Sequence, residues 1–302
     1  MEWFMKATRS GSWFLKRKLP TFLCGVVVTI IIFKLQTIPN TSNRECINWS
    51  EIPADSMTGR QILDYLKWTN QTSCEILSFF GGIVQEQGML SVAGIDGQKA
   101  MCMDFQVEPE VNNCLVYSFG INNEWSFDEA MEKYGCHIFA FDPSMRADDH
   151  MHSKRIHFYN LGLGAEDFIR NDSWKLKTLS SIYNMLEPLD GDRIIDYLKI
   201  DIEGDEWSVI PNIIDSGMLP KIRQMGIEVH LLPVTENIGY YRKLVKTLQL
   251  LEANGMVRFS SLANPASYAY INAFDFTDHT CHEIAWYNLN HYQTAEEIHK
   301  KI

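Results

Sequence analysis

Short apolar runs alternate with longer amphipathic stretches after residue 114, and this alternation restricts the fold more than any other feature. The expected strands cover residues 115–119, 137–141, 156–160, 194–200 and 225–229, and the expected helices cover residues 125–134, 179–186, 206–216 and 238–253. Parallel neighbours in a sheet need crossover connections, which are usually helices. The pattern therefore predicts an α/β fold in which helices cover both faces of a parallel sheet.

Two more strand-like runs, residues 256–260 and 282–289, follow the last expected helix with no helix between them. Strands joined without a crossover helix are usually antiparallel. We therefore expect a Rossmann-like, mostly parallel seven-stranded sheet with an antiparallel insertion at its edge.

The N-terminus carries a basic cluster followed by an apolar run from Leu19 to Phe33, which Lys34 and Leu35 close. The run is short for a membrane span, which usually takes about 17 to 25 apolar residues. A cleaved signal peptide is the alternative, but no A-x-A-like cleavage site follows Phe33. The sequence thus predicts a cytoplasmic tail (1–18), a transmembrane signal anchor (19–35) and a type II orientation, because basic flanks stay cytoplasmic.

Glycosylation acceptor patterns and cysteines agree with a lumenal location in the endoplasmic reticulum or Golgi, or with secretion if the anchor is cleaved. Four N-x-[ST] patterns begin at Asn40, Asn48, Asn70 and Asn171. Six cysteines follow the anchor, and an even set suits disulfides in an oxidising compartment, although the sequence leaves their pairing open. No C-x-x-C pair occurs, so no metal site is expected.

The lumenal part divides into three expected regions. Residues 36–57 are polar and read as a stem, and residues 58–94 as a helical extension in which Thr58 caps a helix over residues 59–78. Residues 95–302 form the main domain. The formal net charge of −11 argues against a nucleic-acid partner, which would need clustered Lys and Arg.

The ends of the first two strands of the main domain suggest a nucleoside site. Ligands in such sheets bind beyond the carboxyl ends of the strands. Gly120 follows the first strand, where a glycine lets the backbone approach a ligand, although a plain turn explains it as well. Asp142 follows the second strand, at the place where a carboxylate accepts hydrogen bonds from ribose hydroxyls, and the alternative is a turn before Pro143.

Carboxylates gather at the end of the fourth strand. Asp201 and Glu203 alternate there, and Asp205 and Glu206 start the next helix, where N-terminal capping would explain them. On the fifth strand Glu228 and His230 should share one face, and His279 and His282 could reach the same rim. A histidine suits general base work near neutral pH, although a single histidine at a strand end is more often structural.

Five strings in this order resemble the animal methyltransferase-like protein 24 family and, more distantly, the FkbM-type methyltransferases: DGQKAMCMD, CLVYSFGINNEWSFDEAM, GCHIFAFDPSM, LKIDIEGDEWSVI and IRQMGIEVHLL. The resemblance runs from about residue 95 to 290. It implies a class I methyltransferase fold, S-adenosyl-L-methionine as the methyl donor and a hydroxyl oxygen as the acceptor.

The resemblance also implies roles for individual residues. Gly120 and Asn122 would line the donor cradle, Asp142 would take the ribose, and Asp201 would lie by the transfer centre. The first loop lacks the acidic residue that many methyltransferases carry there, so Glu124 or the neighbouring asparagines would substitute for it. Glu203, Glu228 and His230 match family motifs without an assigned role, and either His230 or Asp201 would serve as the base.

Two other functions stay open at this point. A type II lumenal glycosyltransferase has the same layout, and Asp201 and Glu203 resemble its metal-binding carboxylate pair. A binding protein that keeps the fold without catalysis is the second. For the acceptor, a lumenal glycan, a glycoprotein or a small hydroxylated molecule is expected.

Overall fold

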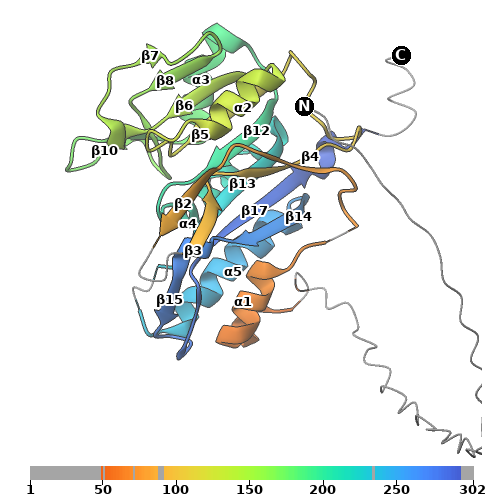
Figure 1. Cartoon of the computed structure of the whole chain (residues 1–302), viewed down its shortest axis with the longest axis vertical. Helices are drawn as coiled ribbons and strands as arrows, with labels where there is room; N and C mark the ends of the chain where they lie inside the picture. The colour runs from red at the N-terminus through yellow and green to blue at the C-terminus, as the bar shows by residue number, and fades with distance from the viewer. Residues whose placement is uncertain (1–48, 50–51, 71, 88–91, 233–234, 294–302) are drawn as a thin grey trace, which may run out of the picture. The chain divides into compact units, whose positions relative to one another are not determined.

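An eight-stranded sheet in the order β14-β17-β13-β12-β5-β6-β8-β7 organises the structure (Figure 1). The computed structural model describes residues 49, 52–70, 72–87, 92–232 and 235–293. Five neighbouring strands of the sheet, from β13 to β8, are parallel. The strands are β5 (Leu115–Phe119), β6 (His137–Phe141), β7 (His150–Met151), β8 (Ile156–Tyr159), β12 (Ile195–Ile200), β13 (Ile222–His230), β14 (Met256–Ala263) and β17 (Cys281–Asn288).

The predicted parallel sheet and its antiparallel strand are confirmed, but the antiparallel strand is not at the edge. β17 runs antiparallel to both β13 and β14 and lies between them, so β14 forms the edge. The connection from β14 to β17 contains a hairpin of β15 (Tyr268–Ile271) and β16 (Phe276–His279). After this hairpin the chain returns as β17 between β14 and β13. The two-residue strand β7, antiparallel to β8, was too short for the sequence pattern to predict.

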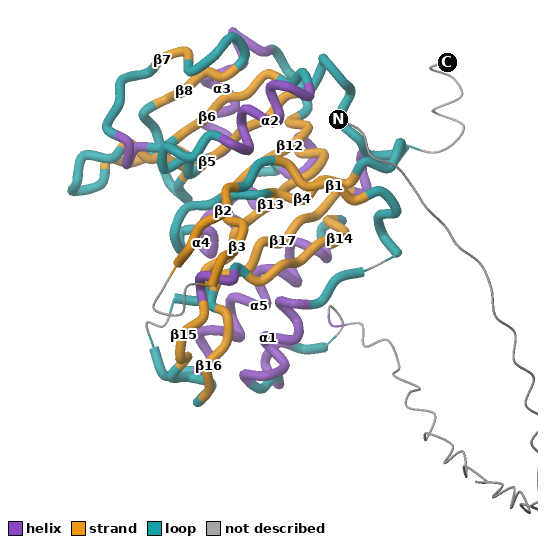
Figure 2. The backbone as a smooth tube through the Cα atoms, viewed as in Figure 1, coloured by secondary structure: helices purple, strands orange, loops and turns teal. Residues whose placement is uncertain are grey.

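Helices cover one face of the sheet. Helices α3 (Leu179–Asp190), α4 (Glu206–Asp215) and α5 (Ile238–Ala253) form a single apolar core with alternate residues of the strands, such as Tyr117, Leu198 and Ile227. This alternation is what a strand with two buried faces produces. Helix α1 (Gly59–Lys67) joins the same core beside α5 (Figure 2).

The sequence predicted helices on both faces of the sheet, but one helix and one strand cover the other face. Helix α2 (Ser126–Tyr134) packs there against Val116 and Ile138, and it ends at Gly135, whose left-handed φ of 111° suits a helix C-terminus. Beside α2 lies a strand, β4 (Lys99–Cys102), in place of a second helix. Gln224 of β13 bonds both backbone groups of Cys102 and so fixes β4 on the sheet.

The predicted helical extension over residues 58–94 is mostly not helical. Thr58 caps α1 as expected, in a reciprocal capping box with Gln61. The helix ends at Lys67 instead of residue 78, because Asn70 accepts hydrogen bonds from Thr72 and Ser73 in a turn. Strands then follow: β1 (Leu77–Phe80) pairs with β4, and β2 (Ile83–Gln87) pairs with β3 (Val92–Asp96). The expected boundary at residue 94 falls inside β3.

A small three-stranded sheet stands next to the ends of the main strands. It contains β9 (Gly162–Leu163), β10 (Phe168–Ile169) and β11 (Lys175–Lys177). Its loop carries the acceptor pattern at Asn171, whose side chain is exposed.

Two disulfides link segments of the chain, one at the end of β4 and one at the start of β5 and β6. Cys74 bonds to Cys102, and Cys114 bonds to Cys136, while Cys281 is a free thiol. The sequence predicted disulfides and left the pairing open. Cys46 and the predicted anchor at residues 19–35 lie outside the described residues.

Among the residues that the structure describes, no helix combines the length and the apolar character of a membrane span.

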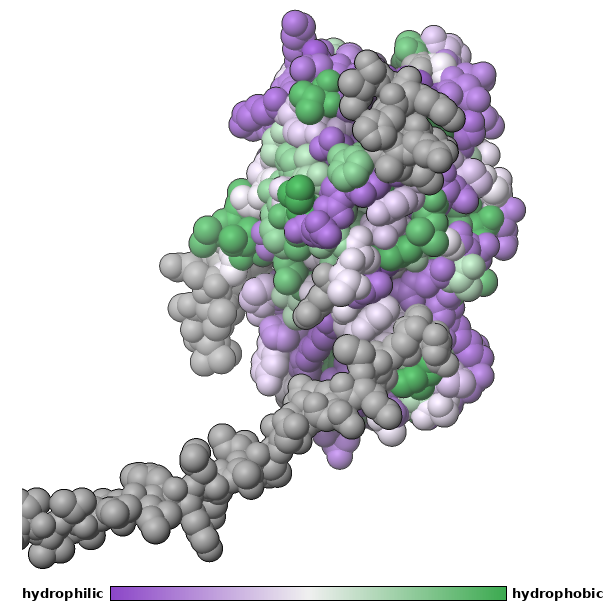
Figure 3. All heavy atoms as spheres, turned by 90° about the vertical axis from the view of Figure 1, so that its right-hand side faces the viewer, coloured by the Kyte–Doolittle hydropathy of each residue, from purple (hydrophilic) through white to green (hydrophobic). Residues whose placement is uncertain are grey.

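Apolar side chains also reach the surface in the N-terminal strands. Ile76, Leu77, Phe79, Ile83, Val84 and Ile95 are all exposed. Figure 3 shows apolar atoms gathered between polar ones on the face at the right-hand side of Figure 1.

Candidate functional site

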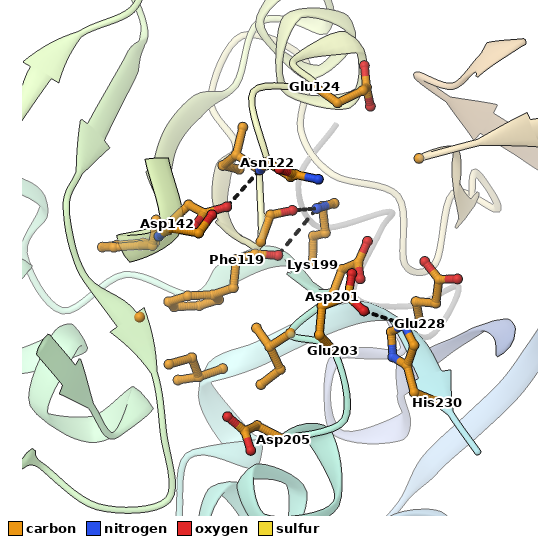
Figure 4. A pocket seen from close by; sticks show the side chains of 18 of the residues that line it. Phe119, Asn122, Glu124, Asp142, Lys199, Asp201, Glu203, Asp205, Glu228 and His230 are labelled. Carbon is orange, nitrogen blue, oxygen red and sulfur yellow. Dashed lines mark hydrogen bonds and ion pairs between the residues drawn. The ribbon is translucent and has the colours of Figure 1, made fainter. Parts of the chain in front are cut away.

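A cavity of about 910 Å³ opens at the carboxyl ends of β5, β6, β12 and β13. Its volume lies in the range of sites for drug-sized ligands. The close-up in Figure 4 shows the acidic side chains of the β12 and β13 ends on one side of this cavity and Asp142 on the other. All eight predicted site residues line the cavity: Gly120, Asn122, Glu124, Asp142, Asp201, Glu203, Glu228 and His230.

Gly120 occupies a position that only glycine fits. Its φ is +78°, and a Cβ placed there would lie 1.6 Å from the carbonyl oxygen of Asp201. The backbone of the first loop therefore crosses directly over the end of β12. Lys199, buried in β12, donates to the carbonyl oxygen of Gly120 at 2.7 Å and to that of Phe119 at 3.3 Å, and so holds the loop in place.

Asp142 is fixed by the backbone around it. One carboxylate oxygen accepts from the amide of Asn122 at 2.7 Å, and the other accepts from the amide of Ser144 at 2.7 Å (Figure 4). Each oxygen keeps a second lone pair for a ligand. Asn122 adopts a left-handed backbone with φ of 44°, which turns its amide toward the carboxylate. The predicted pair of first-loop and second-strand residues is thus one hydrogen-bonded unit.

Glu124 supports the rim from the first loop. Its Oε1 accepts from the amide of Ser126 at 2.7 Å. Its other oxygen lies against Gly97, where a Cβ would approach it to 2.4 Å. The loop after β3 therefore reaches the same cavity, a contact that the sequence did not predict.

Asp201 lies among positive charges at the end of β12. Burial favours its neutral acid, but Lys99 and Lys199 outweigh this effect and hold the pKa of Asp201 below its usual value. Lys99 Nζ lies 3.9 Å from Asp201 Oδ2 and also bonds Glu283 of β17. Glu228, at the end of β13, lines the same part of the cavity as Asp201.

Glu228 behaves differently from Asp201 although the two are neighbours. Burial, and then the negative charges of Glu283 and Asp201, raise the pKa of Glu228 to about 8. Asn264 Nδ2 donates to Glu228 Oε1 at 2.9 Å and orients the group. The pair therefore combines an ionised carboxylate with a carboxyl group that titrates close to neutral pH.

His230 lies between two glutamates. Its Nδ1 is 3.1 Å from Oε1 of Glu206, and its Nε2 is 3.6 Å from Oε2 of Glu203. Burial opposes the charged ring, but hydrogen bonds with Cys281 and Glu206 outweigh burial and raise the pKa of His230 to about 12. A ring that is already protonated cannot accept a proton, so the base role considered for His230 has no support from this geometry.

The carboxylates at the start of α4 do not cap it. Asp205 is the N-cap residue but makes no side-chain cap bond. Glu206 is fully buried, and its two oxygens accept from the amides of Ile202 and Gly204. Capping, which we expected to explain both residues, explains neither, because Glu206 turns back toward the loop and His230.

The two C-terminal histidines lie outside the cavity lining. His279 Nδ1 is 2.9 Å from the carbonyl oxygen of Asn264. His282 is fully buried in β17. The expectation that they contribute to the rim is therefore not met.

Sequence reasoning missed several residues of the site. The sequence could have pointed to Lys199, because a lysine inside an apolar strand is rarely buried without a partner. No sequence feature pointed to the other residues, because their roles depend on segments that meet only in the folded chain: Lys99, Asn264 and Glu283.

A family model described as a methyltransferase domain matches residues 83–277. Probable methyltransferase-like protein 24 of Homo sapiens is 26% identical over 207 residues, which cover 63% of this chain and 55% of that protein. The protein of the same name from Rattus norvegicus is 27% identical over 189 residues, which cover 58% of this chain and 50% of that protein. The chain thus spans about half the length of the curated relatives it matches.

Two solved structures are weakly similar. One is the fibrillarin pre-rRNA processing protein of Methanococcus jannaschii, with a TM-score of 0.35 and 10% identity, covering 62% of this chain and 70% of that one. The other is a mutant 16S rRNA (adenine(1408)-N(1))-methyltransferase from Catenulisporales acidiphilia, with a TM-score of 0.31 and 8% identity, covering 70% of this chain and 98% of that one.

Proposed function

Because this chain belongs to the methyltransferase domain family, we propose that it transfers a methyl group from S-adenosylmethionine to a hydroxyl oxygen. The acceptor in this proposal is a lumenal glycan, a glycoprotein or a small hydroxylated molecule. The unit formed by Gly120, Asn122 and Asp142 carries the proposal.

This unit fits the nucleoside part of the donor. The space that a Cβ at Gly120 would fill is kept open, so the backbone can lie close to a ligand. Free lone pairs on both Asp142 oxygens can accept from two ribose hydroxyls. The many carboxylates of the cavity also suit a donor that carries a positive sulfonium.

The residues on the other side of the cavity would handle the acceptor. S-adenosylmethionine supplies a methyl group that is already electrophilic, so the protein chiefly has to align the acceptor oxygen. Glu228 is our candidate to take the hydroxyl proton, because it lies beside Asp201 in the cavity wall and Asn264 orients it. Asp201, ionised next to Lys99, would stabilise positive charge nearby.

Binding of the donor and of its demethylated product tests the proposal most directly. In calorimetry we expect the purified chain to bind both, and Asp142→Ala to weaken binding by about 10- to 100-fold, since two charge-assisted hydrogen bonds are lost. Asp148→Ala, an exposed acid outside the cavity lining, should leave affinity unchanged. If the wild-type chain binds neither ligand while its fold is intact, the proposal is wrong.

Transfer itself needs a second assay. The chain with labelled donor and a lysate of secretory glycoconjugates should label a hydroxyl-bearing acceptor. Glu228→Gln should bind donor normally and lose transfer by about 10²-fold or more, the usual contribution of a general base. Titration with nucleotide sugars in parallel addresses the glycosyltransferase alternative, which predicts binding of those ligands and not of the donor.

We also propose that the chain is a type II membrane protein of the secretory pathway, anchored through residues 19–35. The two disulfides and the exposed acceptor pattern at Asn171 support this location. Removal of N-glycans with a glycosidase should increase the electrophoretic mobility of the chain made in animal cells.

A further inference from the structure

Three side chains at the ends of β12 and β13 present possible metal-ligand atoms to one another. One atom each from Asp201, Glu203 and His230 lies within 4.8 Å of the others. His230 Nε2 and Glu203 Oε2 are 3.6 Å apart, too far for a hydrogen bond. Ligands bound at about 2.1 Å to one ion are themselves about 3 to 4 Å apart. The separation fits two ligands around a common cation, as well as an ion pair between a protonated His230 and Glu203.

The orientation of His230 points to a ligand independently of the carboxylates. Its Nδ1 faces Oε1 of Glu206 at 3.1 Å, and a carboxylate can only accept, so Nδ1 carries hydrogen. Glu206 cannot turn away, because it is fully buried and bonded to two backbone amides. Nε2 is thus directed at Asp201 and Glu203, and a cation bound there would displace the proton that Nε2 carries in the metal-free protein. Histidines that bind metals are held in this way, through the other ring nitrogen.

The cluster is accessible from the cavity through Glu203. The His230 side chain is 7% exposed, whereas the Glu203 side chain is 84% exposed and faces the cavity. A site with three protein ligands and an open face is the arrangement of a catalytic metal, since further positions stay available to water or to a substrate oxygen.

We propose that Asp201, Glu203 and His230 bind a divalent transition-metal cation that positions the acceptor hydroxyl. One imidazole with two carboxylates favours ions such as Mn²⁺ or Zn²⁺ over Ca²⁺. Metal binding itself is independent of the proposed function, but the role in methyl transfer rests on it. The cysteine spacing of the sequence predicted no metal site, and Asp201 and Glu203 were considered as metal ligands only under the glycosyltransferase alternative, without His230.

In this arrangement the cation lowers the pKa of the bound hydroxyl. As the new bond between oxygen and the methyl carbon forms and the sulfur–methyl bond breaks, the hydroxyl proton passes to Glu228. Glu228 can serve in this step because it lines the same cavity as Asp201 and is oriented by Asn264.

The test measures Mn²⁺ binding to the chain, from which metals have first been removed with EDTA and the EDTA then dialysed away. Calorimetry gives the affinity, and the electron paramagnetic resonance signal of free Mn²⁺ gives the amount bound. We expect one equivalent of Mn²⁺ per chain. His230→Gln and Asp201→Asn should each weaken Mn²⁺ binding at least tenfold. Asp205→Asn is the matched control, because it removes the same charge from the same cavity without removing a ligand. It should change affinity less than twofold.

Glu203→Gln keeps the test valid if the buried variants do not fold, since this side chain is mostly exposed. It should also weaken Mn²⁺ binding at least tenfold. Absence of saturable Mn²⁺ binding by the wild type, or equal weakening by Asp205→Asn, would overturn the inference. Binding of the demethylated donor, measured on the same samples, separates the two proposals: a chain that binds Mn²⁺ but not this ligand supports the metal and rejects the methyltransferase.

Discussion

At the scale of single residues, Gly120 is the position where the backbone leaves least freedom. Its left-handed φ and its approach to the carbonyl oxygen of Asp201 come from one cause, the first loop folding over the end of the neighbouring strand. The loop is therefore not a plain turn, the alternative that the sequence left open. Any side chain here must displace either the loop or β12.

Gly120→Ala should abolish donor binding and lower the free energy of unfolding by more than the 1 to 2 kcal/mol or so that a left-handed alanine costs. Gly191→Ala is the control: its φ is also positive, at +73°, but nothing lies within 4 Å of the added carbon. Urea unfolding and calorimetry of both variants measure the difference. Equal effects of the two substitutions would contradict the close-contact explanation.

Residues at strand ends could be predicted from the sequence because their place follows from the strand pattern alone. Gly120, Asp142 and Asp201 were identified in this way, and the structure brings them to one cavity. Glu206 was misread because a helix N-terminus offers a sufficient local explanation for a carboxylate. Its contact with His230 lies 24 positions away in the sequence, which no local pattern reports.

At the scale of elements, one arginine joins α1, α5 and β14. Arg258 is buried; its Nη1 donates to the carbonyl oxygen of Tyr65 at 2.7 Å, and its Nε donates to Glu252 at 2.8 Å. Tyr65 and Trp286 also donate to the Glu252 carboxylate. The N-terminal helix thus docks on the sheet through a polar junction inside the apolar core.

Arg258→Leu should lower the free energy of unfolding by about 3 to 5 kcal/mol, because Glu252 would stay buried without its counter-charge. The double variant with Glu252→Gln should recover part of this loss. Lys246 of α5 forms an exposed ion pair with Asp55. Lys246→Ala, which breaks this pair, should lower the free energy of unfolding by less than about 1 kcal/mol. Urea unfolding of the four proteins measures these values, and a double variant no more stable than Arg258→Leu would argue against an unpaired charge as the cause.

Helices and strands with a clear periodicity of apolar residues were predicted well, and elements that depend on tertiary contacts were not. Helices α2 to α5 and the strands β5, β6, β8, β12 and β13 agree with their predicted ranges within a few residues. The stretch after Lys67 failed because apolar residues near 76 and 77 continue a helical spacing, although they belong to a strand. What decides between the two is pairing with β4, together with the Cys74–Cys102 disulfide.

At the scale of the whole molecule, stability toward acid depends on a buried histidine. His282 is fully buried, and no hydrogen-bond partner for either ring nitrogen lies among the described residues. Burial, and then the charge of Lys67, lower the pKa of His282 to about 4. The other ionisable neighbours are His279 and Asp278.

The unfolded chain protonates this histidine near pH 6.5, whereas the folded chain resists protonation until about pH 4. Stability from this group is therefore complete above pH 6.5 and is lost as the pH falls from 6.5 to 4, by about 3 kcal/mol in all. In His282→Phe this part of the pH dependence should vanish, which urea unfolding at pH 7.5, 5.5 and 4.5 would measure. Parallel stability profiles of the two proteins would refute the assignment.

The ion network around Asp201 joins residues that are far apart in the order of synthesis. Lys99 neutralises Asp201 and is itself held by Glu283, which lies 184 positions further along the chain. During synthesis the ribosome delivers Lys99 early, then Asp201, and Glu283 close to the end. A chain that ends before Glu283 therefore lacks the group that holds Lys99 beside Asp201.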